Sequence, residues 1–370
     1  AEGCRKLAQD ISLLVGPIIG GILVEMAGWQ SIFLINLPIG LATLVLGAFS
    51  INETSHPEHA HLDLVGLALS IVWLGALTFG LISAGEHGWG DRWTLTTLIL
   101  GVVGLIAFLV FEMRSPKLML SLSLFRDVRF AVANVASFSL GLASYSSVFL
   151  FSMFLQQAQG WSPTQTGLRM APIFVLQMLV SPLVGRLGAR YGLTTVMTAG
   201  YAAFGVSMLG MCWAGPTTPY LAIGLLFALG GFGNALAVPS SNTAAMSYAP
   251  RERSGMVSAV INATRQSGTA IGIALLGALM SMRATSLLTG RLADAGVANP
   301  EAVARAAVFQ HDFSASGALG EEGLRRLFTE AYASGFHAAT LTAAIVALLT
   351  AALLLAVLVP AEARTARQAG

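Results

Sequence analysis

The sequence predicts an all-α protein that crosses a membrane about ten times. Hydrophobic residues make up 55% of the 370 residues and charged residues only 10%, whereas soluble domains carry roughly 25% charged residues. The mean hydropathy is +0.74. Apolar stretches recur along the chain at close to the length of about 20 residues that a helix needs to cross a bilayer. These values exclude disordered, collagen-like, disulfide-rich and ordinary soluble proteins.

The expected spans follow one another with mostly short connections. We place them at roughly 8–27, 31–51, 62–84, 94–112, 130–154, 165–185, 194–213, 218–240, 256–281 and 337–359. The first is the weakest, because its apolar core from Ile11 to Val24 is short, and Arg5 and Lys6 before it leave a signal peptide as an alternative. Three connections are longer: polar 52–61, basic 113–129, and 282–336, which has room for one or two surface helices.

The placement of lysine and arginine predicts the orientation. If the N-terminus is cytoplasmic, the short outer loops hold Arg92 alone. The cytoplasmic segments then hold twelve basic residues: Arg5, Lys6, Arg114, Lys117, Arg126, Arg129, Arg186, Arg190, Arg251, Arg253, Arg364 and Arg367. Because basic residues accumulate on the cytoplasmic side of short loops, we expect a multi-pass cell-membrane protein. Both termini would be cytoplasmic and segment 282–336 would lie outside.

Charge, cysteines and motifs give no sign of an enzyme or a cofactor. The net charge of +2 is too small to indicate a nucleic-acid partner. Cys4 and Cys212 lie far apart and form no disulfide framework or metal motif. His56, His59 and His61 fall in the polar segment 52–61, where a solvated loop is the default over a metal site. We expect no cofactor, no metal and no enzymatic activity.

Small residues gather on faces of the first span. Gly16 and Gly20 lie four residues apart, as do Pro17 and Gly21, so each pair shares a helix face. Small side chains allow a second helix backbone to approach closely, and Pro17 removes a backbone donor and bends the helix. Ordinary packing between helices is by itself a sufficient explanation of this spacing.

Several runs resemble one family. The run Gly16–Leu23, G-P-x-x-G-G-x-L, resembles the antiporter motif in the fifth span of drug exporters of the major facilitator superfamily. Later runs, in the same order, resemble the fourteen-span branch of that family. They are Trp29–Gly40, Leu62–Gly66, Pro116–Phe125, Gly160–Gly167 with Ala171 and Pro172, and Pro250–Gly255 with Asn262, Arg265, Gln266, Gly268 and Gly272.

The resemblance implies a truncated fourteen-span helix bundle with three parts. Residues 1–51 would hold the last two spans of the N-terminal bundle, and 52–129 an inserted pair of spans with cytoplasmic linkers. Residues 130–370 would form a six-span C-terminal bundle that includes the long outer loop 282–336.

The sequence also differs from the family pattern in several places. Four spans that precede the antiporter motif, and that carry the acidic residue linked to proton coupling, have no counterpart here. Residues 1–10 match poorly, and Ala189 stands where the family's loop motif has aspartate. The remaining acidic candidates all lie near span ends: Asp10, Glu25, Asp63 and Glu112. We therefore expect this chain alone not to carry out proton-coupled transport.

Polar side chains within the spans are the candidate substrate-pathway residues. Arg265 lies about nine residues, or ~14 Å, into its span, near the middle of a ~30 Å hydrocarbon core, and Gln266 follows it. An arginine at that depth needs a partner or a water-filled cavity, so a structural role is the alternative. Arg169 lies near a span end, where snorkelling explains it equally well. Asn36 and Asn262 are candidates either for the pathway or for hydrogen bonds between helices.

The resemblance implies secondary active export of hydrophobic or cationic small molecules in exchange for protons, with substrate held at mid-membrane. Two alternatives stay open: export of a metabolite such as a siderophore or a lipid on the same scaffold, and a non-transporting truncated remnant. The expected partners are a small-molecule substrate, protons and the lipid bilayer. Five side chains would line an apolar drug cavity or make ordinary contacts: Phe149, Phe151, Met153, Phe154 and Met170.

Overall fold

The computed structural model describes residues 2–50, 63–114, 122–248, 254–314 and 319–369. Within these ranges the chain forms helices and connecting turns without a strand, which confirms the predicted all-α class. Nine helices in the described part are long and apolar enough to cross a membrane. The remaining expected span, 8–27, lies in α1 (Glu2–Ala27), and Val15–Ala27 is the apolar part of α1 whose side chains are described.

The first third of the chain, up to Arg114, is built from two helical hairpins. In the first, α1 turns at Gly28, which has a φ of +79° that favours glycine, into α2 (Ser31–Leu34) and α3 (Asn36–Ser50). In the second, α4 (Leu64–His87) packs along α5 (Arg92–Arg114). Asp63 caps α4 by accepting a 2.9 Å hydrogen bond from the Gly66 amide, which satisfies one of the unpaired N–H groups at a helix start.

The remaining helices form the main bundle. The first span after the hairpins is continuous but contains two π-helical turns. It comprises α6 (Val128–Ser139), η3 (Leu140–Tyr145), α7 (Ser146–Met153) and η4 (Phe154–Ala158), and it follows the 3₁₀ turn η2 (Leu122–Arg126). The others are α8 (Pro163–Val180), η5 (Ser181–Leu183), α9 (Val184–Tyr191), α10 (Leu193–Met211), α11 (Tyr220–Ser247), α12 (Ser254–Asp294), α13 (Pro300–Arg305), η7 (Ala306–Gln310) and α14 (Gly320–Ala369).

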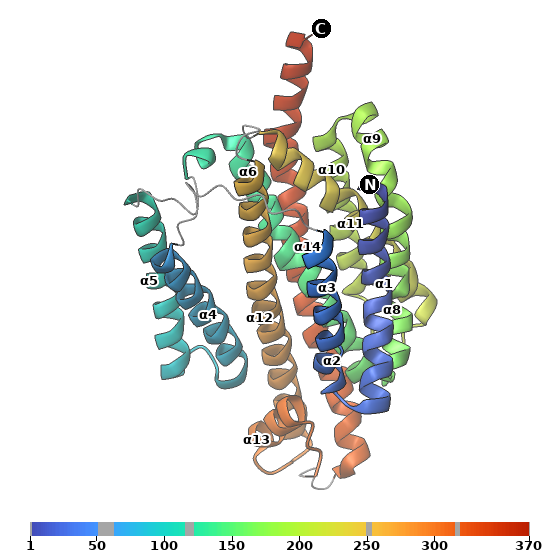
Figure 1. The fold of residues 1–370 in the computed structure, drawn as a ribbon. Coiled ribbons are helices and arrows are strands. Elements are labelled where there is room, and N and C mark those ends of the chain that lie inside the picture. The colour runs from blue at the N-terminus through green and yellow to red at the C-terminus, as the bar shows by residue number, and fades with distance from the viewer. Residues whose placement is uncertain (1, 51–62, 115–121, 249–253, 315–318, 370) are drawn as a thin grey trace.

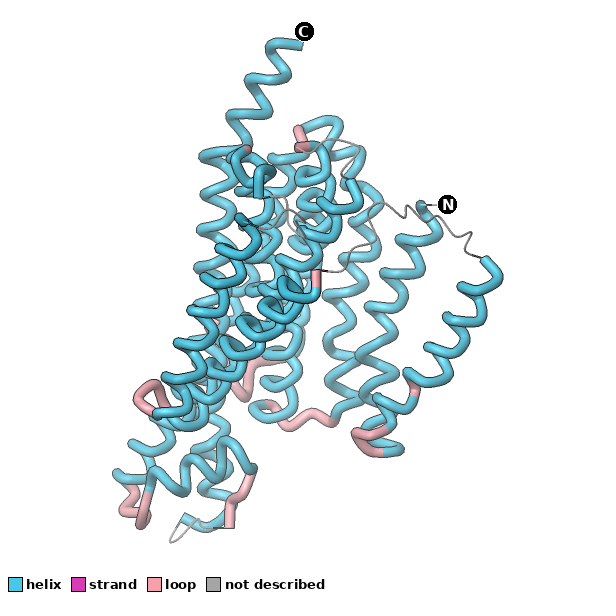
Figure 2. The backbone as a smooth tube through the Cα atoms, turned by 60° about the vertical axis from the view of Figure 1, so that its left-hand side comes forward, coloured by secondary structure: helices cyan, strands magenta, loops and turns pink. Residues whose placement is uncertain are grey.

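The helices run side by side, with α1 along α8 and α12 between the α4–α5 hairpin and the rest of the bundle (Figure 1). The start of α1 and the end of α14 lie at the same end of the molecule in both views (Figures 1 and 2). Aromatic residues fill the centre of the bundle: Phe154 stacks on Phe336 with 4.2 Å between ring centroids, and Phe151 lies 4.7 Å from Phe227.

The segment expected as a long loop, 282–336, is mostly helical, and this corrects the boundaries of two spans. Helix α12 continues to Asp294 and α14 begins at Gly320, with α13 and η7 between them. The continuation is amphipathic, because Ala284, Leu288 and Leu292 recur every four residues and are fully buried. They pack in one core with residues such as Phe328, so the apolar stripe extends the helix beyond the expected end.

Candidate functional site

Helices α1 and α8 meet through glycines that leave no room for a side chain. A Cβ atom on Gly21 would lie 2.6 Å from the Pro163 carbonyl oxygen, and one on Gly167 would lie 2.5 Å from the Pro17 carbonyl oxygen. Each helix therefore presents a glycine to the backbone of the other. The expected packing role of the first span's small residues is found on this face.

The other face of α1 is open. No atom lies within 4 Å of a Cβ built on Gly16 or Gly20, although these residues share the motif with Gly21. Both border a cavity between α1, the α6–α7 span, α8 and α11, which we name the central cavity. Gly16 and Gly20 thus only line open space, whereas Pro17 and Gly21 both contact α8 and border the cavity.

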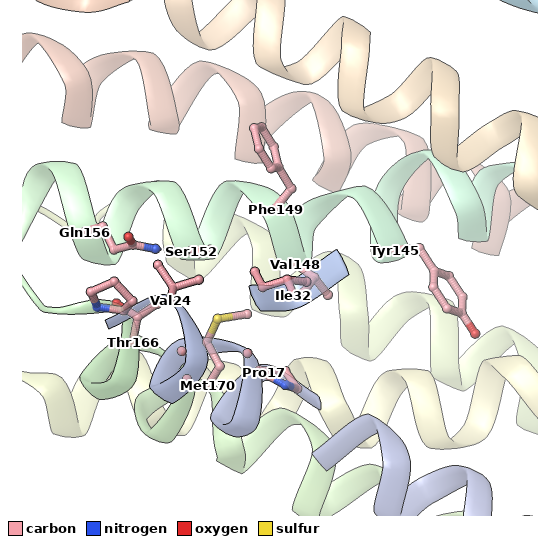
Figure 3. A pocket seen from close by; sticks show the side chains of 14 residues that line it. Pro17, Val24, Ile32, Tyr145, Val148, Phe149, Ser152, Gln156, Thr166 and Met170 are labelled. Atoms are coloured by element: carbon pink, nitrogen blue, oxygen red, sulfur yellow. Dashed lines mark hydrogen bonds between the residues drawn. The ribbon is translucent and has the colours of Figure 1, made fainter. Parts of the chain in front are cut away.

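The central cavity has two adjoining lobes that share Pro17, Tyr145 and Val148. The larger lobe has a volume of about 480 Å³, and Figure 3 shows side chains of its lining, among them Val24, Ile32 and Met170. The smaller lobe has a volume of about 280 Å³ and reaches Ile173, Phe174 and Val238. Volumes of this size and mainly apolar walls are typical of sites for small organic molecules.

A few polar groups interrupt the apolar walls. In the smaller lobe the buried Ser144 hydroxyl donates a 2.7 Å hydrogen bond to Asn234 Oδ1. In the larger lobe the Gln156 side chain donates a 2.8 Å bond to Ser152 Oγ. Thr166, which lines the larger lobe, has a buried hydroxyl without a hydrogen-bond partner among the described residues. A bound molecule with a donor or acceptor can satisfy that hydroxyl, whose isolation is otherwise unfavourable.

Arg265 lies behind Tyr145. Its guanidinium carbon is 5.7 Å from the Tyr145 ring centroid, and the side chain donates hydrogen bonds to Asn242 Oδ1, at 3.2 Å, and to Asn262 Oδ1. Because Asn242 belongs to α11, Arg265 joins α12 to α11. Arg265 is half-buried within the protein and is not among the residues that line the two lobes, whereas Tyr145 lines both.

Arg169 is held by aromatic rings. Its guanidinium carbon lies 3.4 Å from the Trp161 ring centroid and 5.4 Å from that of Tyr220. The Tyr220 hydroxyl also donates a 3.0 Å hydrogen bond to the Arg169 carbonyl. This cation–π arrangement joins the start of α8 to the start of α11. Arg169 is not among the residues that line the two lobes.

The other three expected pathway residues lie away from the central cavity. Asn36 is exposed, and its amide donates to the Ile32 carbonyl one turn earlier in the chain. Asn262 is exposed, bonds the Ser258 carbonyl and accepts from Arg265. Gln266 is exposed on α12. Their role in substrate passage stays a prediction.

Sequence reasoning missed the polar residues that line the cavity. Tyr145, Gln156 and Gln177 belong to it but were not singled out. A polar side chain inside an apolar span is a signal for each of them, and the glutamines were the easiest to notice. Of the five apolar candidates, Phe149 and Met170 line the larger lobe, whereas Phe151 and Phe154 are buried in the bundle core.

The four acidic candidates have different surroundings. Glu25 accepts a 3.2 Å hydrogen bond from Ser162, Asp63 caps α4, and Glu112 is fully buried on α5, whereas nothing is described of the Asp10 side chain. Glu25, Asp63 and Glu112 do not line the central cavity. The described residues contain no cluster of three potential metal ligands, and the three histidines of 52–61 lie outside the described residues.

Three relatives are similar in sequence. Multidrug resistance protein Stp of Mycobacterium tuberculosis is 35% identical over 76% of this chain and 52% of its own length. Methylenomycin A resistance protein of Bacillus subtilis is 31% identical over 73% of this chain and 58% of its own. The tetracenomycin C resistance and export protein of Streptomyces glaucescens is 29% identical over 93% of this chain and 65% of its own. The chain spans between about half and two thirds of the length of these relatives.

One solved structure, a bacterial homologue of the human lysosomal transporter Spinster in an inward-facing and unoccupied conformation, aligns with a TM-score of 0.47 and 16% identity. The alignment covers 94% of this chain and 83% of that one. The model of the family described as Major Facilitator Superfamily matches residues 1–273, which is well over half of the chain. The chain therefore belongs to the Major Facilitator Superfamily, a family of membrane transporters.

Proposed function

We propose that this chain forms part of a transporter that exports hydrophobic or cationic small molecules across the cell membrane in exchange for protons, and that export also requires the four spans that the resemblance places before Gly16. The observation that carries the proposal is the central cavity, which has mainly apolar walls, a few polar groups and a border formed by Gly16, Pro17, Gly20 and Gly21. Relatives named for multidrug resistance and for tetracenomycin C resistance and export support a drug-like substrate. The proton partner rests on the resemblance of Gly16–Leu23 to an antiporter motif.

The apolar walls favour a hydrophobic molecule or a lipophilic cation over a highly polar metabolite such as a siderophore. Only a few polar side chains line the two lobes, whose volumes are about 480 Å³ and 280 Å³. Most polar groups of a highly polar ligand would therefore lack hydrogen-bond partners in the cavity. In the proposed arrangement both termini lie in the cytoplasm. That orientation is supported by the basic residues of the short segments.

The test is efflux of ethidium from energised cells that express the full-length parent of this chain, with and without Gly20→Leu. No atom lies within 4 Å of a Cβ at Gly20, so leucine there occupies the larger lobe without displacing the backbone. We expect a large loss of efflux. The matched control is Gly75→Leu, at an exposed glycine of α4 that also has no atom within 4 Å of its Cβ, and it should retain efflux.

The dependence of efflux on the proton gradient is measured in the same cells. Collapse of the proton gradient by a protonophore should stop efflux while ATP remains present. Normal ethidium efflux by Gly20→Leu, at an expression level equal to that of Gly75→Leu, would show that the central cavity is not the substrate site. Efflux that continues without a proton gradient would contradict the exchange mechanism.

A further inference from the structure

A second cavity lies between α4, α7, α12, η7 and α14 and shares Phe149 with the central cavity; we name it the side cavity. Its apolar lobe has a volume of about 270 Å³ and its polar lobe about 340 Å³. The two lobes adjoin, because Gly85, Glu86 and Phe309 line both. Helix α13, which contributes to the polar lobe, lies at the end of α12 (Figure 1).

The apolar lobe is walled by aromatic rings. Phe149, Phe309 and Tyr332 line it, and Phe149 also lines the central cavity. In Figure 3 the Phe149 ring points away from Pro17 and Met170, so it separates the two cavities. Aromatic faces attract quaternary and other soft cations through the negative potential of the ring.

The polar lobe carries an excess of negative charge. Arg305 donates a hydrogen bond to the Glu86 carbonyl and lies 3.7 Å from the Glu301 carboxylate, so its guanidinium is already engaged. The Glu86 carboxylate has His87 at 4.0 Å as its one ion-pair partner among the described residues, and that histidine is charged only when protonated. Glu86 therefore presents a carboxylate without a permanent cation where the two lobes meet.

We propose that the side cavity binds a lipophilic cation, with its apolar body among Phe149, Phe309 and Tyr332 and its charge facing Glu86. The same chemistry is offered by a free drug-like cation and by the choline headgroup of a phospholipid. The inference goes beyond the proposed function, because binding here requires neither transport nor the central cavity.

The probe is tetraphenylphosphonium, and the assay is equilibrium binding to the purified protein in nanodiscs of phosphatidylglycerol, which has no choline. In the Gly20→Leu protein, whose central cavity is filled, Glu86→Gln should weaken binding about fivefold, the upper range for a partly exposed ion pair. Glu322→Gln removes an exposed carboxylate elsewhere and should change nothing. If choline lipid is the natural occupant, nanodiscs of phosphatidylcholine should weaken binding by competition; equal binding in both lipids assigns the site to free cations.

A pair of glycine variants decides which cavity holds the probe. A Cβ on Gly277, which lines the apolar lobe, would meet only Phe149, at 3.9 Å, so Gly277→Leu fills this lobe. Gly20→Leu fills the central cavity and should leave saturable binding at the side cavity, and adding Gly277→Leu to that protein should abolish the binding that remains. Loss of all saturable binding in Gly20→Leu alone would overturn the proposal and leave the proposed export function intact. Unchanged binding when Glu86→Gln is added to a folded Gly20→Leu protein would also overturn it.

Discussion

Two neighbouring glycines on α1 should respond oppositely to the same added methyl group. In Gly21→Ala the new Cβ would lie 2.6 Å from the Pro163 carbonyl oxygen and 2.9 Å from both the Pro163 carbonyl carbon and Thr164 Cα. Ordinary contact begins at 3.4 Å, so the backbones of α1 and α8 must separate by about 0.8 Å at this point. All three atoms are backbone, so no side-chain rotation can relieve the overlap.

The change in the free energy of unfolding is the sum of two opposing contributions. Overpacking a well-packed contact costs about 1–3 kcal/mol, and replacing glycine by alanine inside a helix returns roughly 1 kcal/mol. Gly20→Ala has the second term alone, because no atom lies within 4 Å of its Cβ. The difference between the two variants therefore isolates the overpacking term, at about 1–3 kcal/mol.

The assay is unfolding in mixed micelles with increasing dodecyl sulfate, followed by circular dichroism, for both alanine variants and the unchanged protein. We expect Gly20→Ala to unfold at the same or a higher detergent fraction than the unchanged protein, and Gly21→Ala at a lower one than Gly20→Ala. Equal free energies of unfolding for the two variants would refute the close α1–α8 contact as the reason for Gly21.

Three further predictions address other parts of the molecule. In the full-length parent, Arg265→Ala should lower efflux strongly without loss of expression, and Arg265→Lys should retain only part of it, because lysine cannot bond two asparagines with a planar fork. Full efflux by Arg265→Ala would reduce this residue to helix packing. In a protein whose two native cysteines are replaced by serine, Glu322→Cys should react with a membrane-impermeant thiol reagent added to intact cells, and Arg186→Cys should not; the opposite pattern would invert the proposed orientation. Hydrogen bonds from Arg129 hold the pKa of the Asp127 carboxyl below its usual range, so the ionised carboxylate stabilises the protein at pH values above its unfolded-state pKa, and this contribution is lost as pH falls through its folded-state pKa. Acidification from about pH 6 to about pH 3 should therefore lower the thermal stability of the unchanged protein more than that of Asp127→Asn. Equal losses in the two proteins would show that Asp127 does not contribute to the acid sensitivity.

The amino-acid sequence by itself determined the class of the protein and most of its membrane helices. A helix in hydrocarbon must satisfy its own backbone and present apolar side chains to lipid, so each span is visible as a local run of about 20 residues. Stretches such as 94–112 and 194–213 therefore coincide closely with α5 and α10. A continuation that is amphipathic is not visible as a continuous apolar run, so the sequence did not predict that α12 extends to Asp294.

Only the tertiary structure decided which residues surround the candidate site. Gly20 and Gly21 are adjacent in the same motif and both border the central cavity, yet only Gly21 contacts α8, because successive helix residues point about 100° apart and the neighbouring helix fills one direction only. Arg265 likewise found its partner Asn242 on another helix. A local pattern can give the depth of such a residue, but its partners depend on contacts between segments that are distant in sequence.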